Sequence, residues 1–411
     1  MQGFLTRVLR AEAHELPALA WAFAYFFLLL ASYYVLRPVR DSLAVGVGTE
    51  QLRWLFSATF AAMLALVPLF GWLSSRLPRA KLLPAVYGFF ALNLLAFTLE
   101  LDPFVFFVWL SVFNLFVVSV FWSFMSDLFD SRQAARLYGT IAAGGSCGAI
   151  AGPLLAALVP QSKVLLLASA ALLAATVVCI AGLARWAKAH PRAGEAPPEL
   201  PLGGSILAGA RAALSSPFLL AICGYLLCYT ALSTALYFQQ VAIVREALPD
   251  AAERTRLFAA VDLVVNTLTL AIQVLAFSRL AALLGPIGML AAVPLLSVAG
   301  FLWLGATPTL AALIAFGVAR RVGEFAVSKP AREALFTIVP REERYKAKNF
   351  IDTVVYRGGD AAAGWLFAGV SAFAAAAVAV GWTGLAVFLG ARMKSWTRDD
   401  ARSSPRLQRQ R

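Results

Sequence analysis

The chain is poor in charge and in the residue types from which most catalytic and metal sites are built. Only 14% of its 411 residues are charged, and it has 2 histidines and 4 cysteines. His14 and His190 lie outside the long apolar runs, which argues against histidine-based catalysis within those runs. The cysteines all lie inside apolar runs, so neither a disulfide framework nor a zinc site is expected. We therefore expect no enzyme activity, no cofactor and no bound metal.

Long apolar runs take up most of the chain. Hydrophobic residues make up 61% of it and the mean hydropathy is +0.76, values typical of an integral membrane protein. A helix needs about 20 apolar residues to cross a bilayer, so the recurrence of such runs predicts an all-α membrane protein with about 12 transmembrane helices. The predicted spans are residues 17–37, 54–73, 82–101, 103–126, 137–159, 164–184, 216–238, 257–278, 286–305, 309–328, 349–370 and 374–391.

The chain is strongly basic, with a formal net charge of +13 and a pI of about 10. In a soluble protein this balance would suggest a nucleic-acid partner. Here the basic residues gather at both termini and in alternate loops, as the positive-inside rule predicts for cytoplasmic segments. We therefore expect a multi-pass protein of the cell (inner) membrane with both termini cytoplasmic, and no nucleic-acid partner.

One polar segment divides the predicted spans into two sets of six. The stretch "RWAKAHPRAGEAPPELPLGGS" (185–205) is rich in proline and glycine, as a linker is. The N-terminus lacks a convincing cleavage site, so no removable signal peptide is expected. The predicted division is an interfacial helix (1–16), an N-terminal six-helix half (17–184), a cytoplasmic linker (185–215), a C-terminal six-helix half (216–391) and a basic cytoplasmic tail (392–411). This layout resembles the major facilitator transporters, whose halves rock around a site near the bilayer midplane.

The first predicted span runs into the charged sequence RPVRD. Residues 18–36 already cover about 28 Å as a helix, so one interpretation is that Arg37, Arg40 and Asp41 mark a helix end in water. That interpretation places two arginines at the non-cytoplasmic end, against the bias of the other loops. The sequence also stays apolar afterwards. We therefore favour a helix that continues past Pro38, with a kink, and carries these charges within the membrane.

The tenth predicted span has the strongest concentration of charge. Arg320 and Arg321 fall near the middle of its apolar run, and Glu324 follows one turn later. Spacings of four and three residues allow Glu324 to pair with either arginine, which would leave the other available for an anion. The alternative is an ion pair that only braces the helix bundle.

Two other spans carry charged residues. Arg357 and Asp360 lie three residues apart in the eleventh span, a spacing at which they can satisfy each other. Asp262 and Asn266 belong to a polar stripe on the eighth span, which should face a wet cavity or a partner helix. Asp262 has no cation within one turn, so its charge must be met from another helix or by a proton. We treat Asp262 and Asn266 as candidates for ion coupling.

Small residues recur at every fourth position of the fifth predicted span. Gly144, Gly148 and Gly152 form a ridge on one helix face, and such ridges let membrane helices approach closely. We expect a packing role. In the same span, Gly139, Gly148, Gly152 and Pro153 resemble a glycine–proline motif of antiporters in the major facilitator group, and that resemblance implies a coupling role as the alternative.

Three segments resemble the ATP/ADP antiporters of plastids and intracellular bacteria and their free-living bacterial relatives. They are "SYYVLRPVRDSLAV", "QAARLYGTIAAGGSCGAI" and "KPAREALFTIVPREERYKAKNFIDTVVYRGGDAAAG". The resemblance implies a nucleotide exchanger of the major facilitator type. However, Glu324 and Asp360 stand where that family has lysines, and a highly charged nucleotide needs cations at its phosphates. These departures argue against simple ATP/ADP exchange.

We predict a secondary transporter that moves a small anionic or zwitterionic solute, including nucleotide-like or phosphorylated ones, as an antiporter or an ion-coupled carrier. The alternatives are a proton-coupled exporter of amphiphilic compounds and a non-transporting or lipid-handling membrane protein. The expected partners are the solute and the lipid bilayer, and the chain is expected to be a monomer. The candidate substrate-binding residues are Arg37, Arg40, Asp41, Arg320, Arg321, Glu324, Arg357 and Asp360, and the candidate coupling residues are Asp262 and Asn266.

Overall fold

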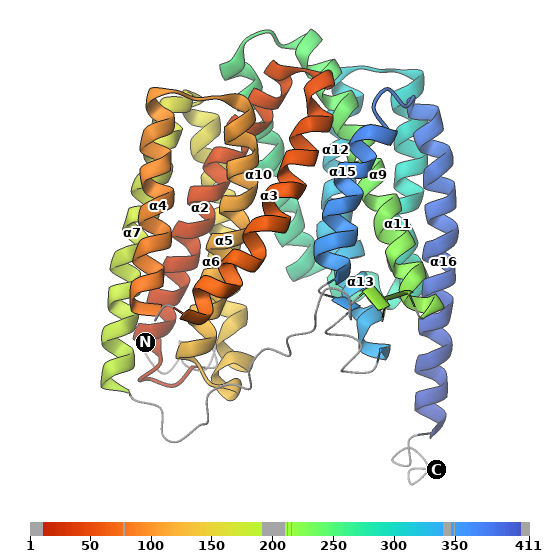
Figure 1. The fold of residues 1–411 in the computed structure, drawn as a ribbon. Coiled ribbons are helices and arrows are strands. Elements are labelled where there is room, and N and C mark those ends of the chain that lie inside the picture. Colours follow the sequence, from red (N-terminus) through yellow and green to blue (C-terminus); the bar gives the residue numbers. More distant parts are fainter. Residues whose placement is uncertain are drawn as a thin grey trace. The chain divides into compact units, whose positions relative to one another are not determined.

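The computed structural model describes residues 11–76, 79–190, 210–211, 213–214, 216–339, 347–348 and 350–403. The regular secondary structure of these residues is helical, without a strand among them (Figure 1). The predicted all-α class is therefore confirmed. Most of the predicted interfacial helix (1–16) and of the linker lies outside the described residues, so both remain predictions.

The helices before the linker are α2 (Leu16–Val47), α3 (Thr49–Arg76), α4 (Arg79–Leu99), α5 (Pro103–Leu128), α6 (Ser131–Leu158) and α7 (Ser162–Ala189). After the linker come α9 (Pro217–Ala247), α10 (Ala251–Leu275), α11 (Phe277–Ala306), α12 (Leu310–Gly323), the π-helix η1 (Glu324–Ser328), α13 (Lys329–Leu335), the 3₁₀ turn η2 (Phe336–Ile338), the π-helix η3 (Ile351–Val355), α15 (Tyr356–Leu366) and α16 (Ala372–Ser403). Of the described helices, 8 are long and apolar enough to cross a membrane. The order matches the predicted spans when α12, η1 and α13 count as one helix and η3 and α15 as another.

Helix α2 continues through the RPVRD sequence. It has 32 residues, about 48 Å at the helical rise, and Pro38 lies inside it. The helix ends at Gly48, whose φ of 84° is unfavourable for a side chain. The prediction that the helix runs on past Pro38 is therefore confirmed.

Helix α11 begins earlier than its predicted span, which started at residue 286. Its first turns, from Phe277, are separated from the rest by a kink at Gly285, where φ is 61°. Proline disfavours helical geometry in the residue before it, and glycine adopts positive φ readily, so the pair Gly285–Pro286 accounts for the kink. The apolar run identified only the part of α11 that follows the kink.

Contacts between helices divide the chain into two compact units. Unit 1 consists of Met1–Gln51, Ala61–Ala196 and Leu248–Asn266, and unit 2 consists of Leu52–Phe60, Pro197–Ala247 and Thr267–Arg411. Two short segments therefore belong to a different unit from the predicted half in which they lie. One is the early part of α3 and the other is the first part of α10. The predicted domain limits themselves remain a prediction.

Unit 1 is packed around α2, which contacts α5, α6 and α7. The glycine ridge of α6 makes this contact close. A Cβ atom added at Gly144 would lie 2.5 Å from the carbonyl oxygen of Phe23, and one at Gly152 would lie 2.8 Å from that of Ala31. A Cβ at Gly148 would overlap the carbonyl oxygen of Phe27. The predicted packing role of the ridge is confirmed by these distances.

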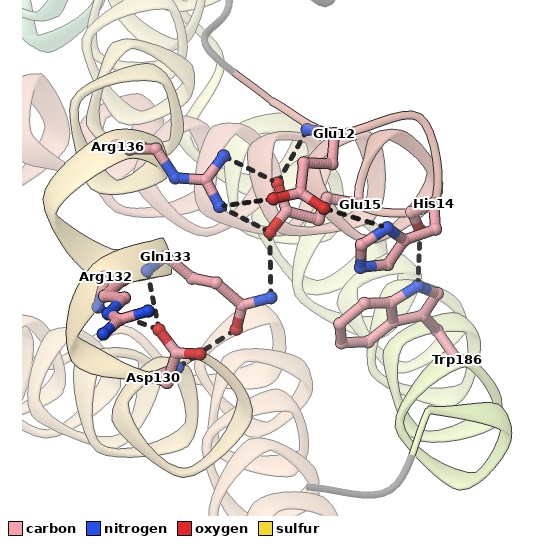
Figure 2. Close-up of polar contacts among 8 residues, drawn as sticks. All are labelled: Glu12, His14, Glu15, Asp130, Arg132, Gln133, Arg136 and Trp186. Carbon is pink, nitrogen blue, oxygen red and sulfur yellow. Dashed lines mark hydrogen bonds and ion pairs between the residues drawn. The ribbon is translucent and has the colours of Figure 1, made fainter.

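A cluster of polar residues ties the start of α2 to the start of α6 (Figure 2). Glu15, which is 1% exposed, accepts hydrogen bonds from Gln133 Nε2 at 2.9 Å and from Arg136 Nη2 at 2.8 Å. Asp130 caps α6 and forms a capping box with Gln133. Burial acts to raise the pKa of the Glu15 carboxyl, but the hydrogen bonds from the Glu12 backbone, Gln133 and Arg136 outweigh it and lower that pKa below its ordinary value.

Both histidines of the chain take part in packing beside this cluster. The imidazole of His190 stacks on Trp186 with 5.0 Å between ring centroids, and His14 stacks on His190 at 5.6 Å. Trp186 Nε1 donates a hydrogen bond to the carbonyl oxygen of His14 at 2.9 Å (Figure 2). The start of α2 is thereby attached to the end of α7 as well.

Candidate functional site

The candidate site of unit 2 is built on a helix that changes geometry in its middle. The helix is α-helical to Gly323, π-helical over Glu324–Ser328 and α-helical again from Lys329. Pro330 cannot donate the backbone hydrogen bond that an α-helix would direct to residue 326, which gives a physical reason for the irregular turn. π-Helical turns are rare and are often found at functional sites.

A second π-helical turn, Ile351–Val355, leads into α15. It carries Asp352, and Arg357 follows it in the first turns of α15. Charged candidates in unit 2 therefore come from two helices that both depart from α geometry. The hydrophobic pattern predicted neither π turn, because an apolar run reports burial and length but not the pitch of the helix.

Glu324 pairs with a residue that the sequence analysis did not select. Its Oε1 accepts a hydrogen bond from Nη1 of Arg332 at 2.9 Å, and both side chains are buried. The predicted pairing with Arg320 or Arg321 is therefore wrong. The prediction considered only partners three or four residues away, whereas Arg332 lies eight residues further on, on the other side of the π turn.

Arg320 is held by α9 instead. Its Nη2 donates to Ser233 Oγ at 2.8 Å and to the carbonyl oxygen of Tyr229 at 3.3 Å. The guanidinium also lies over the ring of Tyr229, 5.3 Å from its centroid. Arg320 is 4% exposed, and its Nε has no hydrogen-bond partner among the described residues. The side chain of Arg320 is thus buried with only part of its hydrogen-bond donor capacity used.

A cavity of about 380 Å³ lies beside the two π turns. Among the predicted substrate-binding residues, Glu324 and Arg357 line it, whereas Arg320, Arg321 and Asp360 do not belong to its lining. The lining residues that the sequence analysis missed are Tyr229, Phe325, Lys329, Arg332, Glu333, Asp352 and Tyr356. For Lys329, Arg332 and Glu333 the signal was the charge in "SKPAREALF", directly after the predicted span 309–328.

Two further ion pairs lie close to this cavity. Arg357 and Asp360 approach to 3.8 Å, so the predicted local pair is confirmed. Lys348 forms an ion pair with Glu333. The cavity is therefore surrounded by charges of both signs, most of which already have a protein partner.

The candidate residues of unit 1 also form ion pairs. Arg37 Nη1 of α2 lies 3.4 Å from Oδ1 of Asp262 in α10, so the first of the two alternatives for meeting the charge of Asp262, a partner from another helix, is the one that the structure has. Arg40 and its neighbour Asp41 pair at 2.7 Å. Asn266 donates from Nδ2 to the carbonyl oxygen of Ala149 at 2.6 Å, which joins α10 to α6. The contacts of Arg37 with Asp262 and of Asn266 with Ala149 link helices of one unit to each other, whereas Arg40 and Asp41 pair within α2.

Membrane-length helices with buried ion pairs and a charge-lined cavity define a membrane protein of the solute-transport class. In the described part of the chain, no group of three or more His, Cys, Asp or Glu side chains is placed to hold a metal ion. The model of the Major Facilitator Superfamily matches residues 18–363, so the chain belongs to this superfamily of transporters. Its function is therefore secondary transport rather than catalysis, and the predicted multi-pass membrane fold is confirmed.

Several solved structures share this fold. The nucleoside transporter NupG matches with 13% identity and a TM-score of 0.62, over 93% of this chain and 99% of that one. The human organic anion transporter MFSD10 (TETRAN) matches with 17% identity and a TM-score of 0.56, over 91% and 98%. A bacterial homologue of the iron transporter ferroportin matches with 12% identity and a TM-score of 0.63, over 92% and 98%. No curated protein matches the chain significantly. Similarities this low establish the fold and not the solute.

Proposed function

We propose that this transporter carries a small anionic or zwitterionic solute by alternating access and that the cavity of unit 2 binds the charged groups of that solute. The observation that carries the proposal is the lining of the cavity, where basic side chains lie beside acidic and aromatic ones. Charged side chains within membrane-spanning regions are costly and usually serve a transport pathway. A site with several donors and aromatic walls suits a small polar organic molecule.

The roles of individual residues follow from their contacts. Arg357 and Glu324 line the cavity and are proposed to contact the solute, while Asp360 and Arg320 adjust the local charge from just outside the lining. Arg321 is also proposed as a substrate-binding residue, because it follows Arg320 directly in the sequence.

The charged residues of unit 1 are proposed to act in the same transport cycle. Arg37, Arg40 and Asp41 lie on one continuous helix, and Arg37 is paired with Asp262. A proton on Asp262 would remove the charge that holds Arg37, so protonation and the packing of α2 on α10 are linked. Because of this link, Asp262, with Asn266 one turn further along α10, is the proposed coupling site.

A nucleotide-like or phosphorylated solute, moved by exchange, is the second candidate. The segment that resembles the ATP/ADP antiporters supplies Lys329, Arg332, Glu333, Asp352 and Arg357, all of which line the cavity. The competing proposal of an amphiphile exporter is based on the antiporter-like glycines and on the mixed charge of the cavity. Those glycines have a sufficient structural explanation in the close packing of α6 on α2.

Transport by reconstituted protein tests the proposal directly. Purified protein in liposomes should take up, or exchange, at least one labelled solute from a panel of amino acids, organic acids and phosphorylated metabolites. Cationic amphiphiles serve as the contrasting class. Uptake of these amphiphiles, with no uptake of any anion or zwitterion, would overturn the proposal in favour of the exporter.

We also propose that the protein is a monomer of the inner membrane with the predicted halves, linker and tail as its domains and both termini cytoplasmic. The loop charge bias supports this orientation. Reporter fusions at residue 195 and at the C-terminus should both give a cytoplasmic signal. A periplasmic signal from either fusion would contradict it.

A further inference from the structure

Among the described residues, the charged side chains that line the cavity of unit 2 are balanced in sign. Three are basic, Lys329, Arg332 and Arg357, and three are acidic, Glu324, Glu333 and Asp352. A ligand with several negative charges would bring charge that this lining does not compensate, and uncompensated charge away from water is costly. A ligand that carries both signs and no net charge leaves the balance unchanged.

One buried residue of the lining, Glu324, has an acceptor atom without a donor. Glu324 is 3% exposed, and while its Oε1 is bound by Arg332, its Oε2 has no hydrogen-bond partner among the described residues. Buried carboxylate oxygens nearly always accept hydrogen bonds, because an unmet acceptor loses the hydration that it would have in water. An ammonium group of a bound ligand would supply the missing donor.

The more exposed part of the cavity offers cations. Lys329 is exposed at the start of α13 and makes no ion pair within 4 Å to another described residue. Arg357 is partly exposed, and its nearest acid, Asp360, is 3.8 Å away, longer than a charge-assisted hydrogen bond. Both side chains can therefore receive a carboxylate of a ligand without breaking a short ion pair.

Aromatic side chains and the size of the cavity limit what else the ligand can be. The rings of Tyr229 and Tyr356 lie 6.1 Å apart between centroids and line the same cavity. Aromatic faces attract cationic groups such as ammonium and pack well against small apolar side chains. The volume of about 380 Å³ is near the lower end of the range of about 300–1,000 Å³ that ligand sites occupy.

From these observations we infer that the solute is a small zwitterion of the amino-acid type, with its ammonium group on Glu324 and its carboxylate group on Lys329 and Arg357. The inference rests on the proposed function and narrows it, because it excludes polyanions such as nucleotides. The bound state would satisfy Oε2 of Glu324 and keep the charge of the cavity balanced.

Ligand binding to the purified full-length protein tests the inference. Each probe is a free amino acid with its two single-charge analogues, for example phenylalanine with phenethylamine and 3-phenylpropionate, and ADP and succinate represent polyanions. We expect at least one amino acid to raise the unfolding temperature and to bind at least about tenfold more tightly than either of its analogues, since each analogue lacks one charge-assisted contact. ADP and succinate should bind more weakly still.

Two variants assign the two ends of the ligand. Lys329→Gln, at an exposed position, should weaken the amino acid and the carboxylate analogue about tenfold and leave the amine analogue unchanged. Glu324→Gln should weaken the amino acid and the amine analogue and leave the carboxylate analogue unchanged. Glu246→Gln, the same change at an exposed position of α9, is the control. If Glu324→Gln fails to fold because Arg332 has lost its partner, Lys329→Gln still decides the carboxylate end.

The outcomes separate the inference from the proposed function. Binding of ADP or succinate without binding of any amino acid overturns the zwitterion and leaves an anion transporter. Binding of amines alone overturns both. An equal loss of affinity for all three probes in Lys329→Gln, or no binding of any amino acid at all, also counts against the zwitterion, while liposome uptake of labelled anions continues to test the proposed function.

Discussion

The two units hold buried charge in different ways. In unit 1 the charged residues stand on regular helices: Arg37 of α2 meets Asp262 of α10 and so joins two helices, whereas Arg40 pairs with its neighbour Asp41 on the same helix. In unit 2 the charged residues stand on two helices with π turns, line a cavity and include a carboxylate oxygen, Oε2 of Glu324, without a hydrogen-bond partner in the described part of the chain.

The difference shows that buried charge alone does not locate a binding site. A buried ion pair between two regular helices fixes their contact, and removing one partner leaves a charge in a medium that solvates it poorly. Charge next to an irregular turn and a cavity is available to a ligand. We therefore expect changes in unit 1 to act mainly on stability and changes in unit 2 to act mainly on binding.

The largest effect is expected from Asp262→Ala. It leaves Arg37 without the acid that lies 3.4 Å away, in a pair whose side chains are 17% and 2% exposed. Loss of one member of a buried pair typically costs about 3–5 kcal/mol. The measurement is the unfolding free energy of the purified protein in detergent. The double variant Arg37→Leu with Asp262→Ala should recover most of this loss, and an unchanged stability of Asp262→Ala would show that the pair is not structural.

A smaller effect, and on a different property, is expected from Arg357→Gln in unit 2. Removing a charge-assisted contact to the solute should weaken binding by about 1.5–3 kcal/mol with little change in unfolding temperature. Arg256→Gln, at an exposed position of α10, is the matched control. Arg40→Gln should show the reverse pattern, with a larger loss of stability than of affinity. If Arg357→Gln and Arg40→Gln lost stability and affinity to the same extent, the distinction between a structural role of charge in unit 1 and a binding role in unit 2 would be wrong.

The close packing of α6 on α2 in unit 1 can be tested by adding one methyl group to a glycine of α6. Gly148→Ala places a Cβ where the carbonyl oxygen of Phe27 lies, whereas Gly139→Ala on the same helix meets no atom within 4 Å. We expect Gly148→Ala to lower the unfolding free energy by about 1–3 kcal/mol, as overpacking commonly does. Gly139→Ala should be neutral or slightly stabilising, because alanine favours helix. Equal stability of both variants would contradict the close approach of α6 to α2.

Much of the fold could be predicted from the sequence, because its main signal is the length of apolar runs. Those runs predicted the membrane helices, and the apolar residues after RPVRD correctly predicted that α2 continues. The four-residue spacing of small residues predicted the contact of α6 with α2. Each of these inferences needed only the regular geometry of the α-helix.

The candidate site was harder to predict, because it departs from that geometry. The partner of Glu324 was misassigned, since its helix changes pitch at that residue and the true partner, Arg332, lies beyond the apolar run. The partner of Asp262 was not identifiable from local spacing either, because Arg37 comes from a helix far away in the sequence. The most useful sequence feature that the prediction did not use is Pro330. It follows the π turn Glu324–Ser328 and interrupts the hydrogen bonds of the helix.

Among the variants of unit 1, the smallest effect on the unfolding free energy is expected at Glu15, outside the membrane-spanning segments. The hydrogen bonds from Gln133 and Arg136 hold the pKa of Glu15 below its ordinary value of 4.5. A carboxyl whose pKa is lower in the folded state stabilises the protein above its unfolded pKa, and this contribution is lost as the pH falls through the folded pKa. Glu15→Gln should therefore cost about 1 kcal/mol at neutral pH, the usual net worth of a hydrogen bond, and almost nothing in strong acid.

Unfolding measured between pH 7 and pH 3 can separate this contribution from general acid denaturation. The natural protein should lose stability below about pH 4.5 more steeply than Glu15→Gln, because the variant has no carboxyl to protonate at that position. Glu246→Gln, the same change at an exposed position of α9 outside the cluster, is the control. If the stability of Glu15→Gln depended on pH as that of the natural protein does, the cluster at the start of α2 would be held by packing around Trp186 rather than by charge.

In unit 2, Glu333→Gln should have little effect on the unfolding free energy. Its pair with Lys348 is about 40% exposed on both sides, and such pairs contribute at most about 1 kcal/mol.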